Sequence, residues 1–153
     1  MPAVLSPSTT APKAHRRRVA LVLVALLALA SLAACTPEET RGMQLTNDTR
    51  HNTGRAYLNY NDSLYFKAQG WSQQLASSGG LSHSNLASGA PGGWRRLGEN
   101  VGVGGSVDAV FNALMGSEGH RNNILDPGFN NFAVGVTRGG DGRYWVVQEF
   151  ATL

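Results

Sequence analysis

The 153-residue sequence has only one cysteine, Cys35. A single thiol cannot form a disulfide within the chain, so the fold must be stabilised by its core alone. The sequence also has no apolar run of roughly 20 residues, the length that a helix needs to span a bilayer. Its most apolar stretch, from Val19 to Ala34, covers 16 residues. We therefore expect no permanent membrane-spanning helix.

An excess of basic charge is missing from most of the chain. The formal net charge is +3, but Lys13, Arg16, Arg17 and Arg18 all lie just before the apolar stretch. After residue 34 there remain nine Lys and Arg against ten Asp and Glu, a net charge of −1. Nucleic-acid binding depends on a surplus of basic side chains that neutralise phosphates. We expect no nucleic-acid partner, and a monomeric protein.

Basic residues followed by a short apolar run are typical of a signal peptide, here residues 1–34. The run ends in Leu32-Ala33-Ala34-Cys35, which resembles the bacterial lipobox, whose cysteine is lipidated and becomes the first mature residue. This resemblance implies an extracytoplasmic protein held on a bacterial membrane through Cys35. An ordinary secretory signal with a chance cysteine is the alternative. We predict a linker over residues 35–41, of at most ~20 Å when extended, and one domain over residues 42–153.

The spacing of apolar residues predicts helices in the first part of that domain. Leu64, Ala68, Trp71 and Leu75 recur along one helical face, with Asn61 or Asp62 as the cap at the start and Gly79 at the end. Residues 40–53 are polar and only weakly amphipathic, so they predict at most a short helix. Residues 82–98 are rich in Ser, Asn, Gly and Pro, which indicates a long loop.

The second part of the domain changes from a helical to an alternating pattern. Ser106 and Ser117 can each begin a helix, the second ending near Leu125. Apolar residues then alternate over residues 132–137 and 144–150, with a glycine-rich turn between them, and predict two antiparallel strands. A short strand is also possible over residues 100–103. The pattern indicates an α+β domain in which helices cover a small antiparallel sheet.

Common catalytic motifs are absent. There is no G-x-S-x-G, and Gly102-Val103-Gly104-Gly105 does not complete the glycine pattern of a dinucleotide-binding loop. The side chains that could take part in catalysis or in metal binding are His83, Glu99 and His120. His51 lies in a polar stretch and is expected to be solvated.

Several short blocks around these residues resemble the bacterial branch of the CAP superfamily, which comprises cysteine-rich secretory proteins, antigen 5 and pathogenesis-related 1 proteins. The resemblance covers residues 45–151. It is carried by Leu81-Ser82-His83, Gly98-Glu99-Asn100-Val101, Ser117-x-x-His120-Arg121-x-Asn123-Ile124-Leu125, Gly135-Val136 and Val147-Gln148-x-Phe150.

The resemblance implies an α-β-α sandwich with a small central antiparallel sheet, and a cleft where two histidines and two acidic residues meet. His83, Glu99 and His120 match three of these positions, and such clefts can hold Zn²⁺ or another divalent cation. The fourth acidic residue has no clear match; Glu118 is the nearest candidate. Side chains at positions i and i+2 of a helix point about 200° from one another. Glu118 and His120 can therefore meet only if the helix begins at or after His120.

These observations leave three functions open. The first is an extracytoplasmic lipoprotein whose cleft binds a small ligand, either lipid-like or from the cell envelope, with or without a divalent metal. The second is a metal-dependent hydrolase in which Glu99 acts as general base on a water held by His83 and His120. The third is a structural envelope protein, in which the three side chains only hydrogen-bond one another and tie the loop to the domain.

Overall fold

The structure, a computed structural model, describes residues Cys35–Leu153. The predicted signal peptide, residues 1–34, lies outside the described residues. Among the residues that are described, no helix combines the length and the apolar character needed to cross a membrane.

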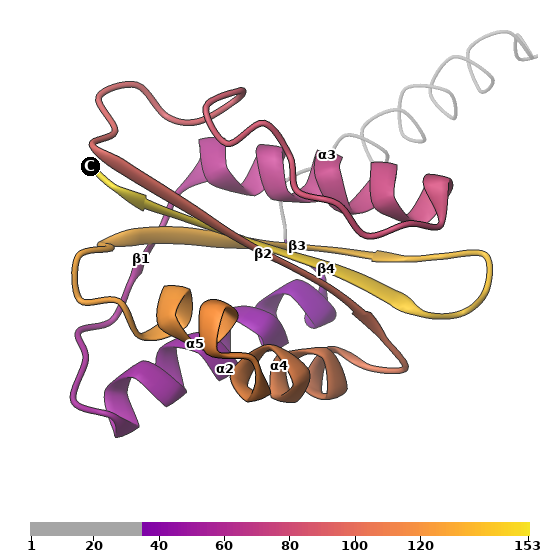
Figure 1. Cartoon of the computed structure of the whole chain (residues 1–153), viewed down its shortest axis with the longest axis horizontal. Helices are drawn as coiled ribbons and strands as arrows, with labels where there is room; N and C mark the ends of the chain where they lie inside the picture. The colour runs from indigo at the N-terminus through magenta and orange to yellow at the C-terminus, as the bar shows by residue number, and fades with distance from the viewer. Residues whose placement is uncertain (1–34) are drawn as a thin grey trace, which may run out of the picture. The chain divides into compact units, whose positions relative to one another are not determined.

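A four-stranded sheet lies between two layers of helices, with α3 over one face and α2, α4 and α5 over the other (Figure 1). The helices and strands are α2 (Pro37–Asn52), β1 (Asn59–Tyr60), α3 (Asp62–Ser78), β2 (Arg96–Gly104), α4 (Val107–Gly116), α5 (Glu118–Leu125), β3 (Asn131–Arg138) and β4 (Tyr144–Thr152). This arrangement confirms the predicted α+β sandwich.

The strand order is β1-β3-β4-β2. β4 pairs antiparallel with both β2 and β3, and the predicted terminal hairpin is confirmed. The sheet is nevertheless mixed, because the two-residue β1 pairs parallel with β3, Asn59 opposite Asn131. The sequence contains no sign of β1, since two residues are too few to show an alternating pattern.

Helix α2 begins three residues before the predicted segment 40–53. Its N-cap is Thr36, whose Oγ1 accepts a hydrogen bond from the Glu39 backbone N–H at 3.2 Å, while Glu39 Oε2 accepts one from the Thr36 N–H at 2.7 Å. This reciprocal capping satisfies backbone donors that an extended chain would leave to water. The predicted linker over residues 35–41 is therefore mostly helical, and within it only Cys35 and Thr36 lie before the helix.

The buried face of α2 is polar, which explains why its apolar pattern is weak. Glu39, Gly42, Thr46 and Arg50 are buried at helical spacing. The Arg50 guanidinium donates to the carbonyl groups of Ala56, Ile124 and Asp126 at 2.8–2.9 Å. Burial lowers the pKa of Arg50, but these carbonyls satisfy its donors and join α2 to the end of α5.

Helix α3 has the predicted ends. Asn61 Oδ1 accepts from the Leu64 N–H at 3.1 Å, and Gly79 ends the helix in the left-handed region at φ 72°. The helix lies so close to the sheet that a Cβ at Gly135 would be 2.3 Å from the Ala68 carbonyl carbon. Glycine at this position of β3 is therefore required by the packing.

Strand β2 is longer than the predicted segment 100–103 and includes residues 96–98, which we had expected in the loop. It pairs with β4 along its whole length, so that Glu99 lies opposite Glu149 and Asn100 opposite Gln148. Neighbouring residues of a strand point to opposite faces of the sheet. Two carboxylates therefore point to the α3 side of the sheet, and two amides to the side of α4 and α5.

Candidate functional site

A charged cluster lies between α3 and the sheet. It consists of Lys67 from α3, Glu99 from β2 and Glu149 from β4, whose side chains are 5%, 1% and 0% exposed. The Lys67 ammonium is 2.5 Å from Glu149 Oε1 and 3.8 Å from Glu99 Oε2. Charged side chains are almost never fully buried unless they are paired, so the three residues stabilise one another.

His83 lies on this cluster at its solvent side. Its Nδ1 is 2.6 Å from Glu99 Oε1, although the ring itself is 59% exposed. The next residue, Ser84, donates its backbone N–H to Glu99 Oε1 at 3.0 Å, and its hydroxyl accepts from Lys67. An ionised carboxylate only accepts hydrogen bonds, so Nδ1 of His83 is the donor. Within residues 35–153, Nε2 forms no hydrogen bond.

The two carboxyl groups differ in their affinity for a proton. Burial raises the pKa of Glu149 to about 8, even though the Lys67 ammonium acts in the other direction and the Glu99 charge adds to the rise. Burial acts to raise the pKa of Glu99 as well. Hydrogen bonds from Ser84, Glu149 and His83 outweigh burial, so the pKa of Glu99 is lowered. Glu149 therefore keeps its proton to a higher pH than Glu99 does.

One oxygen of the cluster supports a protonated Glu149. Glu149 Oε2 is buried and, in the described part of the chain, has no hydrogen-bond partner as an ionised group. A buried polar atom without a partner costs roughly 1–3 kcal/mol. Because Glu99 lies directly opposite on β2, a proton on Glu149 turns two facing acceptors into a donor and an acceptor.

On the other face of the same strands, neutral side chains form an amide ladder, defined here as Thr46, Gln148, Asn100 and Asn123. Gln148 donates to Thr46 at 2.9 Å, Asn100 donates to Gln148 at 3.0 Å, and Asn123 donates to Asn100 at 2.9 Å. Asn100 also donates to the His120 carbonyl at 3.1 Å. The amide ladder thus joins α2, β4, β2 and α5, and it fixes the backbone that carries His120.

His120 is within electrostatic range of His83. Burial lowers the pKa of His120, and the positive charge of protonated His83 lowers it further. The structure therefore brings two of the residues that the sequence singled out, His83 and Glu99, into direct contact, and His120 feels the charge of His83.

Glu118 does not join this group. Helix α5 begins at Glu118, two residues before His120, and the Glu118 side chain is exposed. Both residues are helical, so they point in widely different directions. The condition under which Glu118 could share a cleft with His120 is not met.

The residues do not fit a tetrahedral zinc site. In residues 35–153, no group of three or more His, Cys, Asp or Glu side chains is placed to hold a metal ion. Zinc sites need several deprotonated ligands directed at one point. Here Glu99 already accepts from His83 and Ser84 and faces the Lys67 ammonium, which would repel a second cation.

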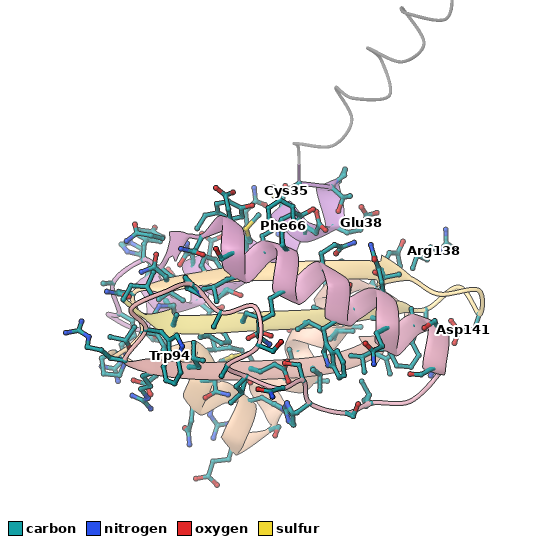
Figure 2. All side chains as sticks on the ribbon, turned by 90° about the horizontal axis from the view of Figure 1, so that it is seen from above. Cys35, Glu38, Phe66, Trp94, Arg138 and Asp141 are labelled. Carbon is teal, nitrogen blue, oxygen red and sulfur yellow. The ribbon has the colours of Figure 1, made fainter. Side chains whose placement is uncertain are left out.

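Beside the charged cluster, the surface is hollowed. A hollow of about 360 Å³ lies between α3 and the loop after it, and Lys67 and Ser84 form part of its wall. Phe66, which is 68% exposed and projects from the outer side of α3 (Figure 2), lines the same hollow. The remaining lining residues are Gly70, Trp71, Gln74, Asn85, Ser88 and Gly89. Aromatic, amide and hydroxyl groups thus surround one buried ammonium.

Sequence reasoning missed Lys67 and Glu149. Glu149 follows the alternation of Trp145 and Val147, both buried on the α3 side. Lys67 lies on α3 directly before the buried Ala68 and three residues after the buried Leu64. A charged residue at an expected core position was the available signal, but the pairing across 82 residues depends on the register of the sheet.

Comparisons with known proteins agree with this fold. The family model described as "CAP: Cysteine-rich secretory protein family" matches residues 43–150. The curated protein YkwD of Bacillus subtilis (strain 168), whose name describes it as uncharacterized, is 31% identical over 119 residues, 72% of this chain and 46% of that protein. The chain thus spans about half the length of this curated relative.

Two solved structures show the same fold. An outer surface protein from Borrelia burgdorferi has a TM-score of 0.68 and 15% identity, covering 78% of this chain and 96% of that one. An extracellular protein containing a SCP domain from Bacillus anthracis str. Ames has a TM-score of 0.65 and 23% identity, covering 79% of this chain and 45% of that one.

Proposed function

The chain belongs to the cysteine-rich secretory protein family, and from this premise we propose that it is an extracytoplasmic, lipid-anchored protein whose His83 site binds a small molecule of the cell envelope. The proposal has two parts, an anchor at Cys35 and a binding site at His83. They rest on different observations and can be tested separately.

The position of Cys35 supports the anchor. Only Thr36 separates this cysteine from α2, so a lipid on its sulfur would hold the domain directly against the bilayer. Tyr60, Tyr65 and Phe66 form an aromatic cluster near Cys35, with ring centroids 6.1 and 5.6 Å apart, and Tyr60 contacts the cysteine. Figure 2 shows Cys35 and Phe66 on the same side of the domain. Tyrosine is enriched at the membrane–water interface.

Labelling with radioactive palmitate tests the anchor. We expect the parent protein to take up label and to sediment with membranes, and the Cys35→Ala variant to do neither. A Thr36→Ala variant is the matched control, because it alters the neighbouring residue and keeps the thiol. Label in the Cys35→Ala variant would refute lipidation at this position.

The binding site rests on one observation: His83 is 59% exposed while the carboxylate that orients it is 1% exposed. Burying Glu99 is unfavourable unless hydrogen bonds compensate, and the result is an imidazole with a fixed ring and a free Nε2 at the surface. His120 is within electrostatic range of it, and the hollow lined by the next residue, Ser84, offers aromatic and amide groups. This combination suits a small molecule with hydrogen-bonding groups and an apolar face.

NMR spectroscopy of the histidine rings tests the binding site. Palmitate and soluble peptidoglycan fragments are the two probes, one lipid-like and one from the cell wall. We expect one of them to shift the His83 and His120 signals in a saturable way, and the binding to be lost in His83→Ala and kept in His51→Ala. If neither probe moves these signals, the site does not bind these classes of envelope molecule.

The arrangement does not favour the hydrolase that the sequence left open. That mechanism requires the Glu99 carboxylate to activate a water molecule. The carboxylate is 1% exposed and accepts hydrogen bonds from His83 and Ser84, so it is not free to take a proton from water at the surface. A binding function requires no such freedom.

A further inference from the structure

Lys67 connects four separate parts of the domain. Its ammonium, carried by α3, contacts Glu149 on β4 at 2.5 Å, lies 3.8 Å from Glu99 on β2, and donates to the Ser84 hydroxyl in the loop. Only 5% of its side chain is exposed. Lysine side chains are rarely buried, because dehydrating an ammonium is unfavourable. The buried position of Lys67 therefore requires an explanation.

The explanation lies in the two carboxyl groups. Glu99 and Glu149 face one another across β2 and β4, with side chains 1% and 0% exposed. Two buried carboxylates repel each other unless a cation or a proton lies between them. The described residues do not fit a metal ion here, and Lys67 is the basic group within 4 Å of both carboxyls.

We propose that Lys67 is a positioning residue, whose ammonium is the resident cation of this site and holds Glu99, and through it His83, in place. The contacts form a chain from the ammonium to Glu99 and Ser84, and from Glu99 to the His83 ring. The site therefore needs no metal ion to keep its shape. The inference deepens the proposed binding site and relies on it only for the role of His83.

The test uses the full chain in four forms: the parent, Lys67→Met, Lys67→Arg and the double variant Lys67→Met/Glu149→Gln. Methionine keeps the length and apolar character of the stem and removes the charge. Arginine keeps the charge, and the double variant removes the Lys67 ammonium together with the ionisable carboxyl group of Glu149. Arg41→Met is the matched control, since it removes a cation from the half-exposed pair with Asp108.

Two measurements report on the positioning. Hydrogen exchange of the Ser84 amide reports its bond to Glu99, and the NMR signal of the His83 Nδ1 proton reports the bond between ring and carboxylate. In Lys67→Met we expect Ser84 exchange to rise about tenfold or more and the ring proton signal to be lost. Lys67→Arg and the double variant should recover most of the Ser84 protection and of the His83 ring proton signal. Arg41→Met should match the parent in both measurements.

A melting experiment completes the test. We expect the same melting temperature for the parent in a chelator and in excess Zn²⁺. A Zn²⁺-induced rise that is lost in His83→Ala would show that a metal, not Lys67, is the resident cation. Unchanged Ser84 exchange in Lys67→Met would equally overturn the inference. If Lys67→Met does not fold, failure of both Lys67→Arg and the double variant to restore the two signals would overturn it. Since no ligand is involved, these outcomes are independent of whether the site binds an envelope molecule.

Discussion

The two faces of one strand pair differ in a way that separates support from function. On β2 and β4, Glu99 and Glu149 point toward α3, while their neighbours Asn100 and Gln148 point toward α4 and α5. The amide side is neutral, and every link of the amide ladder is a hydrogen bond of ordinary length. The carboxylate side carries charge, requires a lysine and leaves one oxygen without a partner unless it is protonated.

This difference teaches how the site is built. Satisfied neutral networks add rigidity at little risk, whereas buried charges cost stability and tend to persist where they serve a function. The amide ladder fixes the backbone of β2 and of α5, and so places Glu99 and His120. The charged cluster then orients the one exposed group, His83.

The largest effect should come from breaking the amide ladder. Asn100→Ala removes hydrogen bonds to Gln148, Asn123 and the His120 carbonyl, and it leaves buried polar atoms without partners. We expect a loss of about 3 kcal/mol or more in the free energy of unfolding, measured by urea denaturation. Asn85→Ala, in the exposed loop, is the control. A loss below about 1 kcal/mol would show that the ladder is not a support.

A smaller, pH-dependent effect should come from Glu149→Gln. The Glu149 carboxyl ionises near 4.5 when unfolded, but burial raises its pKa to about 8 in the folded protein. Its contribution to stability is therefore complete below pH ~4.5 and is lost as the pH rises through about 8. We expect the parent to lose stability relative to Glu149→Gln between pH 5 and 9, by a few kcal/mol.

The contributions of Glu99 and His120 to stability depend on pH in the opposite direction. The pKa of Glu99 is lowered by hydrogen bonds that outweigh burial, and the pKa of His120 is lowered by burial. Their contributions to stability are present above the pKa values of the unfolded chain and are lost as the pH falls through the pKa values of the folded protein. Parallel stability curves for the parent and Glu149→Gln across the whole range would contradict the raised pKa of Glu149.

The smallest effect should come from Glu118→Gln. Because Glu118 is exposed at the start of α5 and points away from His120, we expect a change within about 0.5 kcal/mol in the free energy of unfolding. The ring signals of His83 and His120 should also keep their positions. A shift of the His120 signal would mean that Glu118 takes part in the site after all.

Local sequence signals predicted the elements whose buried faces are apolar. Asn61 and Ser106 cap α3 and α4 as expected, since capping depends only on neighbouring residues. Helix α2 was underestimated because its buried face carries Glu39, Thr46 and Arg50, whose partners come from other parts of the fold. Apolar periodicity cannot reveal a polar face that is buried by hydrogen bonds.

The same distinction between local signals and tertiary contacts applies to the site residues. The sequence indicates His83, Glu99 and His120 because histidines and carboxylates carry acid–base chemistry and because the three lie in short blocks that resemble a family. Lys67 and Glu149 lie in stretches that were interpreted as a helix face and a strand, and their role follows only from the register that places Glu99 opposite Glu149. Glu118 was proposed from closeness in sequence, and the start of α5 decides against it.

The state of the His83 ring tests the central claim most directly. The nitrogen chemical shifts of both ring atoms can be measured by NMR in the parent protein near neutral pH. We predict that the proton of the neutral ring resides on Nδ1, held by Glu99, and that Nε2 is unprotonated and faces solvent. A proton on Nε2, or rapid exchange between the two forms, would show that the buried carboxylate does not orient this ring.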